Sequence, residues 1–278
     1  MTTTLDRAVL FVDLLGFAKL TEDNPLDLGA IRDSQNPLSG NVDQLLAVDR
    51  NLLTSAFTSF HYTLKWAIEL AQMKHTLTAI TFSDSAFIAT TRLSEAIGVA
   101  TYILQSLLRA RVPVRAAIAY GSFAAVRFRS DVSLEGGDHS AHFLGTGVVW
   151  SHATESCGIK GLRILLHPSA AALLDNQDHR PSDDQNTSYV TCSPEESANA
   201  LGVQFEIDYW KFKPTAESEA WHALQDMWNT APQVALPHYE ATAQAINRMR
   251  VSQGEEPILN LRRRTLRRRT CPLTARTT

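Results

Sequence analysis

An apolar run near the N-terminus, residues 8–12, ends on a single carboxylate, Asp13, and the chain then turns at Gly16. An unbroken apolar run of this kind is typical of a strand buried inside a sheet. A carboxylate at the end of such a strand is costly to bury unless a cation or a hydrogen-bond donor meets it. Two interpretations are open: Asp13 shapes the turn, or it binds a metal ion while the following backbone N–H groups contact phosphate.

Composition restricts the class of protein. The chain has 278 residues and a formal net charge of -3, which predicts neither a nucleic-acid partner nor a membrane partner. No apolar segment approaches the ~20 residues of a membrane helix, and residues 1–4 carry no secretory pattern. Three scattered cysteines, Cys157, Cys192 and Cys271, argue against a disulfide framework and against a zinc site. We therefore expect a cytoplasmic protein.

Hydrophobic periodicity predicts alternating strands and helices in the first half of the chain. The predicted elements are a strand at 8–13, a helix at 42–72, strands at 77–82 and 86–89, a helix at 93–109 and a strand at 112–120. This is the order of a ferredoxin-like sheet. The fold class is therefore α+β, with a mainly antiparallel sheet and helices packed on one face.

The second half gives weaker signals. Its predicted elements are a strand at 124–128 paired with the preceding one, a helix at 145–155, strands at 162–166 and 205–212, and helices at 168–174 and 237–251. Turn residues predict an insertion at 21–40, and a polar stretch predicts a surface loop at 175–200. We assign a catalytic domain to residues 1–234, and a helix with a basic, disordered tail to residues 235–278.

A second carboxylate, Asp84, lies in the corner between the strands at 77–82 and 86–89. In a ferredoxin-like sheet the first strand lies beside this hairpin, so Asp13 and Asp84 converge at one edge. Paired carboxylates with oxygen ligands suit Mg²⁺ or Mn²⁺, and two such ions about 4 Å apart suit phosphoryl chemistry. The alternative is that Asp84 only shapes a Ser-Asp-Ser turn.

Four segments carry a resemblance to a known family. Residues 11–17, Phe-Val-Asp-Leu-Leu-Gly-Phe, resemble the metal-binding signature of class III nucleotide cyclases, and residues 81–84, Thr-Phe-Ser-Asp, resemble that family's second metal segment. Residues 112–121 resemble its Val-Arg-x-Gly-Ile-x-x-Gly strand, and residues 145–155 its Asn-Arg helix. The four segments occur in the order that the family has.

The resemblance implies a homodimer with active sites at its interface. Asp13 and Asp84 would act as catalytic carboxylates that hold two Mn²⁺ or Mg²⁺ ions, with the carbonyl of Leu14 as a further ligand. The N–H groups of Leu15, Gly16 and Phe17 would lie near the substrate phosphates. The implied reaction is attack of the ribose 3′-hydroxyl on the α-phosphate, with release of pyrophosphate.

Departures from the family pattern bear on the substrate. Ile80 stands where purine cyclases have an adenine-reading lysine, and His142 stands at their other base-reading position; His142 is alternatively a structural histidine. A site that loses its base-edge hydrogen bond loses discrimination, which disfavours an ordinary adenylate or guanylate cyclase. Val149 replaces the transition-state asparagine of the family, and Ala153 replaces its arginine.

Intact metal segments with a degenerate Asn-Arg helix resemble the bacterial Pycsar pyrimidine cyclases. This resemblance implies cyclic UMP or cyclic CMP made from a pyrimidine NTP during antiphage defence, with a separate effector protein that responds to it; we prefer cyclic UMP. Lys211 and Lys213 are candidates for binding the triphosphate, or they are solvent-facing residues of an edge strand. Arg115 and Arg163 are expected to be structural.

Two other classes stay open. One is a catalytically degenerate domain that binds a nucleotide and signals, which Val149 and Ala153 favour. The other is a two-metal nuclease or polymerase-palm enzyme. A nuclease predicts a basic channel, whereas positive charge gathers only in the tail, at residues 262–264 and 267–269. That tail carries no interleaved aromatic residues for base stacking, so we expect a solvated segment.

Overall fold

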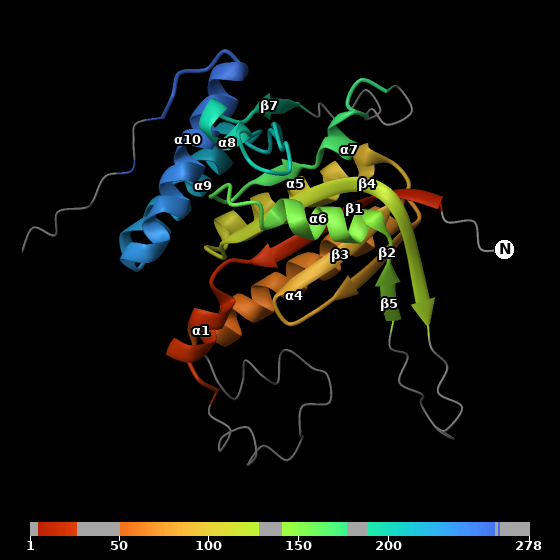
Figure 1. Ribbon diagram of the computed structural model, residues 1–278. Coiled ribbons are helices and arrows are strands. Elements are labelled where there is room, and N and C mark those ends of the chain that lie inside the picture. Colours follow the sequence, from red (N-terminus) through yellow and green to blue (C-terminus); the bar gives the residue numbers. More distant parts are fainter. Residues whose placement is uncertain (1–4, 27–50, 128–140, 177–187, 259–260, 262–278) are drawn as a thin grey trace, which may run out of the picture.

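The computed structural model describes residues 5–26, 51–127, 141–176, 188–258 and 261. A sheet of eight strands runs through this part of the chain (Figure 1), in the order β2-β3-β1-β4-β6-β8-β7, with β5 paired to β4. The strands are β1 (Leu5–Leu14), β2 (Leu77–Thr81), β3 (Ser85–Thr90), β4 (Val114–Arg127), β5 (Ala141–Leu144), β6 (Ile164–Leu166), β7 (Tyr189–Thr191) and β8 (Phe205–Ile207). Only the β4–β6 pairing is parallel among these strands.

The first four strands confirm the predicted α+β class and its ferredoxin-like order. Helix α4 (Leu52–Gln72) connects β1 to β2, and α5 (Leu93–Arg109) connects β3 to β4. Strand β1 therefore lies between β3 and β4, antiparallel to both. Because β1 has a neighbour on each side and packed layers on both faces, its residues 8–12 are all buried, which explains the unbroken apolar run.

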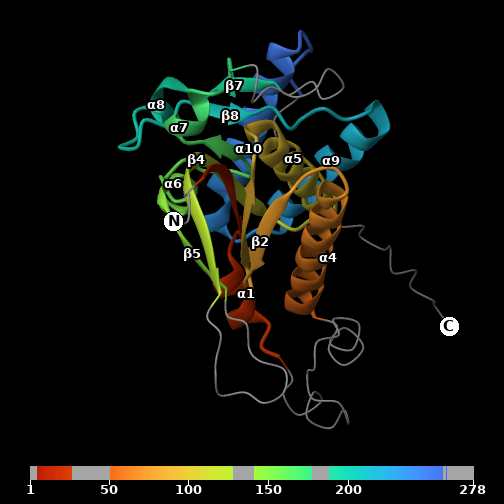
Figure 2. The same ribbon diagram turned by 90° about the vertical axis from the view of Figure 1, so that its right-hand side faces the viewer.

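Two layers of helices enclose the sheet at β1, and Figure 2 shows the sheet nearly edge-on between them. Helices α4 and α5 cover one face, where Leu10 and Val12 join the main core. Helix α6 (Thr146–Glu155) crosses the other face, where the ring centroids of Phe11 and His152 lie 5.1 Å apart. The two long helices thus pack on one face as predicted, and α6 adds a partial layer on the face that carries Asp13.

Several local predictions need correction. Residues 124–127 do not form a separate strand paired with residues 112–120, because they continue β4 and pair with β5. The predicted loop at 175–200 contains β7 and the short helix α8 (Pro194–Ser197). The predicted strand at 205–212 stops at Ile207, the end of β8.

The remaining helices are α1 (Phe17–Asp23), α7 (Pro168–Ala171), α9 (Pro214–Thr230), the 3-10 turn η2 (Gln233–Ala235) and α10 (Leu236–Ser252). The sequence did not predict α9. Most of the predicted insertion, the start of the predicted first helix and the basic tail lie outside the described residues. None of the described helices is both long and apolar enough to span a membrane.

Helix α10 packs into the same core as the sheet. Its residues Ile246 and Met249 are fully buried, and Thr242 Oγ1 accepts a hydrogen bond of 2.8 Å from the backbone N–H of Leu162. Arg248 Nη2 lies 3.0 Å from Oε1 of Glu206, a fully buried carboxylate on β8. The C-terminal helix is therefore tied to the sheet by apolar contacts and by an ion pair.

Candidate active site

Asp13 and Asp84 come together at one edge of the sheet. Asp13 is the next-to-last residue of β1 and is paired in register with Ser85, the first residue of β3. Asp84 directly precedes Ser85, and its carbonyl oxygen accepts a 2.8 Å hydrogen bond from the Leu14 N–H. The strand order thus brings the two residues to one edge of the sheet, as the sequence predicted, where the charge of Asp84 acts on Asp13.

The turn that carries Asp84 is held from two sides. The Ser83 hydroxyl donates to Asp84 Oδ1 at 3.3 Å. From α4, His61 Nε2 lies 3.2 Å from the Ser83 carbonyl oxygen, which can only accept, so this ring nitrogen is the donor. His61 could not be identified from the sequence, because its role depends on how α4 packs over the hairpin.

The surroundings of Asp13 favour a neutral carboxyl group in the metal-free protein. Burial first, and then the negative charges of Glu155 and Asp84, raise the pKa of Asp13 to about 7, against a smaller lowering effect of Arg115. Three carboxylates therefore share this corner with one cationic side chain. A divalent cation would relieve their mutual repulsion.

An ion pair between Arg115 and Glu155 lies beside Asp13. Arg115 of β4 is the cross-strand partner of Asp13, and its Nε and Nη2 both contact Glu155 Oε1, at the end of α6. The side chains of Arg115 and Glu155 are 14% and 5% exposed. Arg115 therefore has a structural contact, as expected, but one that lies within the candidate site.

The chain turns sharply after the first carboxylate. The Leu15 N–H donates to the Pro113 carbonyl oxygen at 2.9 Å, so it is already engaged. A phosphate bound in this turn would therefore be contacted mainly by the N–H groups of Gly16 and Phe17. Gly16 has a φ of 76°, which only glycine adopts at little cost, and it caps α1, which begins at Phe17. The first amides of a helix lack intrahelical acceptors. The proposed roles of Leu14, Gly16 and Phe17 stay predictions.

The donor set fits a Mg²⁺ or Mn²⁺ ion. Asp13 and Asp84 offer two carboxylates, and these ions are bound by one or two carboxylates together with waters and substrate phosphates. No group of three or more His, Cys, Asp or Glu side chains suited to a metal occurs in the described ranges, so no all-protein cage is formed there. The site therefore suits a cation that arrives with a phosphate.

A row of apolar and aromatic side chains lies next to the carboxylates, and the ring of Phe11 within it is buried. Ile80 of β2 is in register with Phe87 of β3, which is in register with Phe11 of β1, so the three side chains form a row on the Asp13 face. The rings of Phe11 and Phe87 lie 4.6 Å apart, and Phe143 of β5 reaches to 6.1 Å from Phe87. We call Phe11, Phe87 and Phe143 the aromatic patch. From the family resemblance, Ile80 was expected near the nucleotide base, whereas the three aromatic rings were not identified from the sequence.

Three other predicted substrate residues, His142, Lys211 and Lys213, lie on or after strands other than β1, β2 and β3. His142 lies on β5 opposite Val126, and its side chain lies outside the described residues. Lys211 and Lys213 follow β8 instead of lying on an edge strand, and Lys213 caps α9. Neither lysine is among the charges that act on Asp13. Their binding role stays a prediction.

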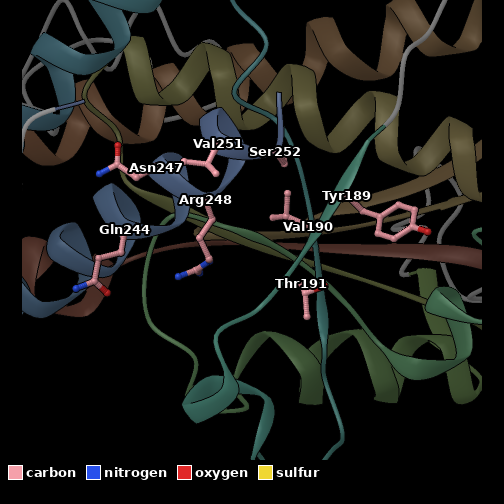
Figure 3. Close-up of a pocket in the computed structure, with 8 residues that line it drawn as sticks. All are labelled: Tyr189, Val190, Thr191, Gln244, Asn247, Arg248, Val251 and Ser252. Atoms are coloured by element: carbon pink, nitrogen blue, oxygen red, sulfur yellow. The ribbon is translucent and has the colours of Figure 1, made fainter. Parts of the chain in front are cut away.

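A groove of about 730 Å³ lies elsewhere, between β7 and α10 (Figure 3). Its lining residues are Tyr189, Val190, Thr191, Gln244, Asn247, Arg248, Val251 and Ser252. Arg248 is paired with Glu196 at 3.1 Å and with Glu206 at 3.0 Å, so its charge is already balanced. None of the lining residues belongs to the carboxylate site, so the groove is separate from it.

No protein-family model and no curated protein sequence matches the chain. Solved structures with similar folds include the guanylyl cyclase Cya2, at 12% identity over 73% of this chain and 91% of that chain, with a TM-score of 0.45. Adenylate cyclases from Trypanosoma brucei match at 14% identity over 74% and 89%, also with a TM-score of 0.45. A dimeric guanylyl cyclase domain of the RhoGC fusion protein from Blastocladiella emersonii matches at 11% over 73% and 95%, with a TM-score of 0.45. Likenesses this distant assign neither a family nor an activity.

Proposed function

We propose that this protein is a metal-dependent nucleotide cyclase, which converts a pyrimidine NTP into a 3′,5′-cyclic mononucleotide and pyrophosphate. The observation that carries the proposal is the convergence of Asp13 and Asp84 at neighbouring strand ends, beside the aromatic patch. Carboxylates suit the metal–triphosphate end of a nucleotide, and aromatic rings suit a flat base. Four sequence segments that resemble class III cyclases support the same function.

The reaction is an intramolecular displacement at phosphorus. The ribose O3′ forms a bond to the α-phosphorus, and the bond from the α-phosphorus to the oxygen that bridges it to the β-phosphorus breaks. Pyrophosphate leaves with the electron pair of that bond, and the O3′ proton passes to solvent. Asp13 and Asp84 would hold two Mn²⁺ or Mg²⁺ ions, with the Leu14 carbonyl as a further ligand. When bound, these ions supply charge neutralisation on the triphosphate and acidify the attacking hydroxyl. The amides of Gly16 and Phe17 would orient phosphate oxygens.

A pyrimidine substrate is supported by Ile80, which lies on the Asp13 face and offers no hydrogen bond to a purine edge. We prefer UTP, and CTP is the alternative. The product would act as a second messenger in cytoplasmic antiphage defence, read by a separate effector protein. These assignments rest on the resemblance to Pycsar cyclases.

A homodimer would cover the open part of the Asp13 face. Phe82, whose ring lies 6.4 Å from that of Phe87, is 49% exposed there, and Val149 on α6 is 64% exposed. Exposed large apolar side chains beside a site are typical of a surface that a partner covers. A second copy would bury them and would close the nucleotide site against water. Lys211 or Lys213 of the second copy would then be available for the triphosphate.

The test is incubation of the purified protein with each of the four NTPs, with Mn²⁺ or Mg²⁺, followed by identification of the products by mass. We expect cyclic UMP and pyrophosphate, and at least a hundredfold loss of rate in Asp13→Asn and Asp84→Asn. Asp226→Asn, in the ion pair with Arg111 on another side of the molecule, is the matched control. Four intact NTPs under both metals would contradict the proposal.

One observation favours a second function. Val149 and Ala153 offer no polar group on α6 where class III cyclases have an asparagine and an arginine. A domain that binds a nucleotide and signals without turnover would tolerate this. Calorimetric binding of UTP with manganese, in the absence of any product, would select this alternative.

A further inference from the structure

Arg115 has a neighbouring carboxyl group, that of Asp13, to which it makes no ion pair in the structure. It lies directly across from Asp13 on the adjacent strand. Side chains in such cross-strand positions have Cβ atoms about 4.5–5.5 Å apart, within easy reach for an arginine–aspartate pair. The guanidinium group instead gives its Nε and one terminal nitrogen to Glu155 of α6.

The position of Glu155 is unfavourable for a carboxylate on local grounds. It is the last residue of α6, where the helix dipole disfavours negative charge, and the residue is only 4% exposed. A buried carboxylate without a partner would be strongly destabilising. Arg115 supplies that partner, so Glu155 and Asp13 are alternative acceptors for one guanidinium group.

We propose that Glu155 is a positioning residue that holds the Arg115 guanidinium away from Asp13 and so keeps the Asp13 carboxylate open to a divalent cation. The inference rests on the metal use in the proposed function. Without the charge of Glu155, the guanidinium pairs with Asp13 and takes the place of the metal ion. Glu155 thus acts on metal binding through Arg115, without being a ligand itself.

Two other ionisable groups, Cys157 and His238, interact electrostatically with Arg115, but neither carries a negative charge that could replace Asp13 as its acceptor. Burial raises the pKa of the Cys157 thiol, so that the thiol stays neutral. Burial, with the positive charges of Arg115 and Lys160, lowers the pKa of His238, so that this imidazole is neutral as well. Asp13 is therefore the acceptor left in register with Arg115 once Glu155 is neutralised.

The test compares the full-length wild-type protein with Glu155→Gln, which keeps the shape and removes the charge. Binding of Mn²⁺ alone is measured by electron paramagnetic resonance of the free ion. We expect Glu155→Gln to bind Mn²⁺ at least tenfold more weakly. The double variant Glu155→Gln/Arg115→Gln should bind within threefold of wild type, because the competing cation is gone. Glu217→Gln, in the partly buried pair with Arg250, is the matched control and should bind as wild type does.

A crystal structure of metal-free Glu155→Gln gives a readout that needs no metal. We expect the Arg115 guanidinium on the Asp13 carboxylate, and a guanidinium that stays on residue 155 would overturn the inference. Mn²⁺ affinity within twofold of wild type in Glu155→Gln would also overturn it. If the single variant does not fold, the double variant decides, and a tenfold loss of Mn²⁺ affinity there refutes the role. A wild-type protein that binds no Mn²⁺ refutes the proposed metal site, while the crystal structure still reports on Arg115.

Discussion

Replacing Asp13 with asparagine should stabilise the metal-free protein at alkaline pH and change little in acid. The folded protein raises the pKa of Asp13 from 3.8 to about 7, chiefly through burial and through Glu155 and Asp84. In the unfolded chain the carboxyl group ionises near its usual pKa. Below about pH 4 both states are protonated and Asp13 contributes nothing. Between the two pKa values the unfolded state loses its proton first, so stability falls as pH rises, and above about pH 7 the full cost is present.

The size of the effect follows from the two pKa values. Their difference corresponds to about 4 kcal/mol at 1.36 kcal/mol for each pH unit. Asp13 is only partly buried, and solvent screening reduces this to about 2 kcal/mol. The asparagine variant, which carries no charge at any pH, should therefore gain about 2 kcal/mol at pH 8 and less than half of that at pH 5. The corresponding rise in melting temperature at pH 8 is roughly 4–8 °C.

The assay is urea unfolding of both proteins with a chelator present, at pH 5 and pH 8, followed by circular dichroism. Asp226→Asn serves as the control, because it neutralises a carboxylate in an ion pair with Arg111 away from the site. A loss of stability in Asp13→Asn that is equal at both pH values would refute the reasoning. It would mean that the Asp13 carboxylate is held by favourable contacts instead of being repelled by its neighbours.

Two further changes test the scaffold. Gly145→Ala should abolish stable folding or lower the melting temperature by more than 10 °C. The reason is that φ of Gly145 is 134° and a Cβ there would lie 2.0 Å from the Ser122 carbonyl oxygen. Thermal melts measure the effect, and a melting temperature near that of the wild type would contradict the prediction. Glu206→Gln should cost about 3 kcal/mol in urea unfolding because it leaves the fully buried Arg163 short of one anionic partner, whereas Glu69→Gln, in an exposed pair, should cost less than about 0.5 kcal/mol. Equal costs for the two glutamates would contradict the assigned burial.

The sequence was sufficient for the part of the fold in which each element has a strong period. The apolar run at 8–12 and the stripes of α4 and α5 have long, regular patterns, and their order determined the ferredoxin-like arrangement. Helix α9 was missed because its buried side chains include small ones, such as Ala220 and Ala223. Strand β7 has three residues, too few for any period to be visible.

The candidate site likewise has a part that can be predicted from the sequence and a part that cannot. The convergence of Asp13 and Asp84 follows from strand order alone, so the sequence could predict it. The Arg115–Glu155 pair depends on the β1–β4 register and on where α6 ends, and neither can be read from residue spacing. The aromatic patch needs Phe143 of β5 to lie within 6.1 Å of Phe87 of β3. These residues are more than 50 positions apart in the sequence, and local patterns do not encode such a contact.

The ion pair between β8 and α10 has a consequence for the order of events during synthesis. Glu206 is fully buried, and one of its two cationic partners, Arg248, follows it by 42 residues. Until α10 has left the ribosome, this carboxylate lacks half of its neutralising charge, and the β6–β8 side of the sheet lacks the apolar cover of Ile246 and Met249. The β1–β4 part of the sheet can form while the chain is still attached. Completion of the other side must wait until α10 has been synthesised, so chains stalled before α10 would expose apolar strands of that side to chaperones and proteases.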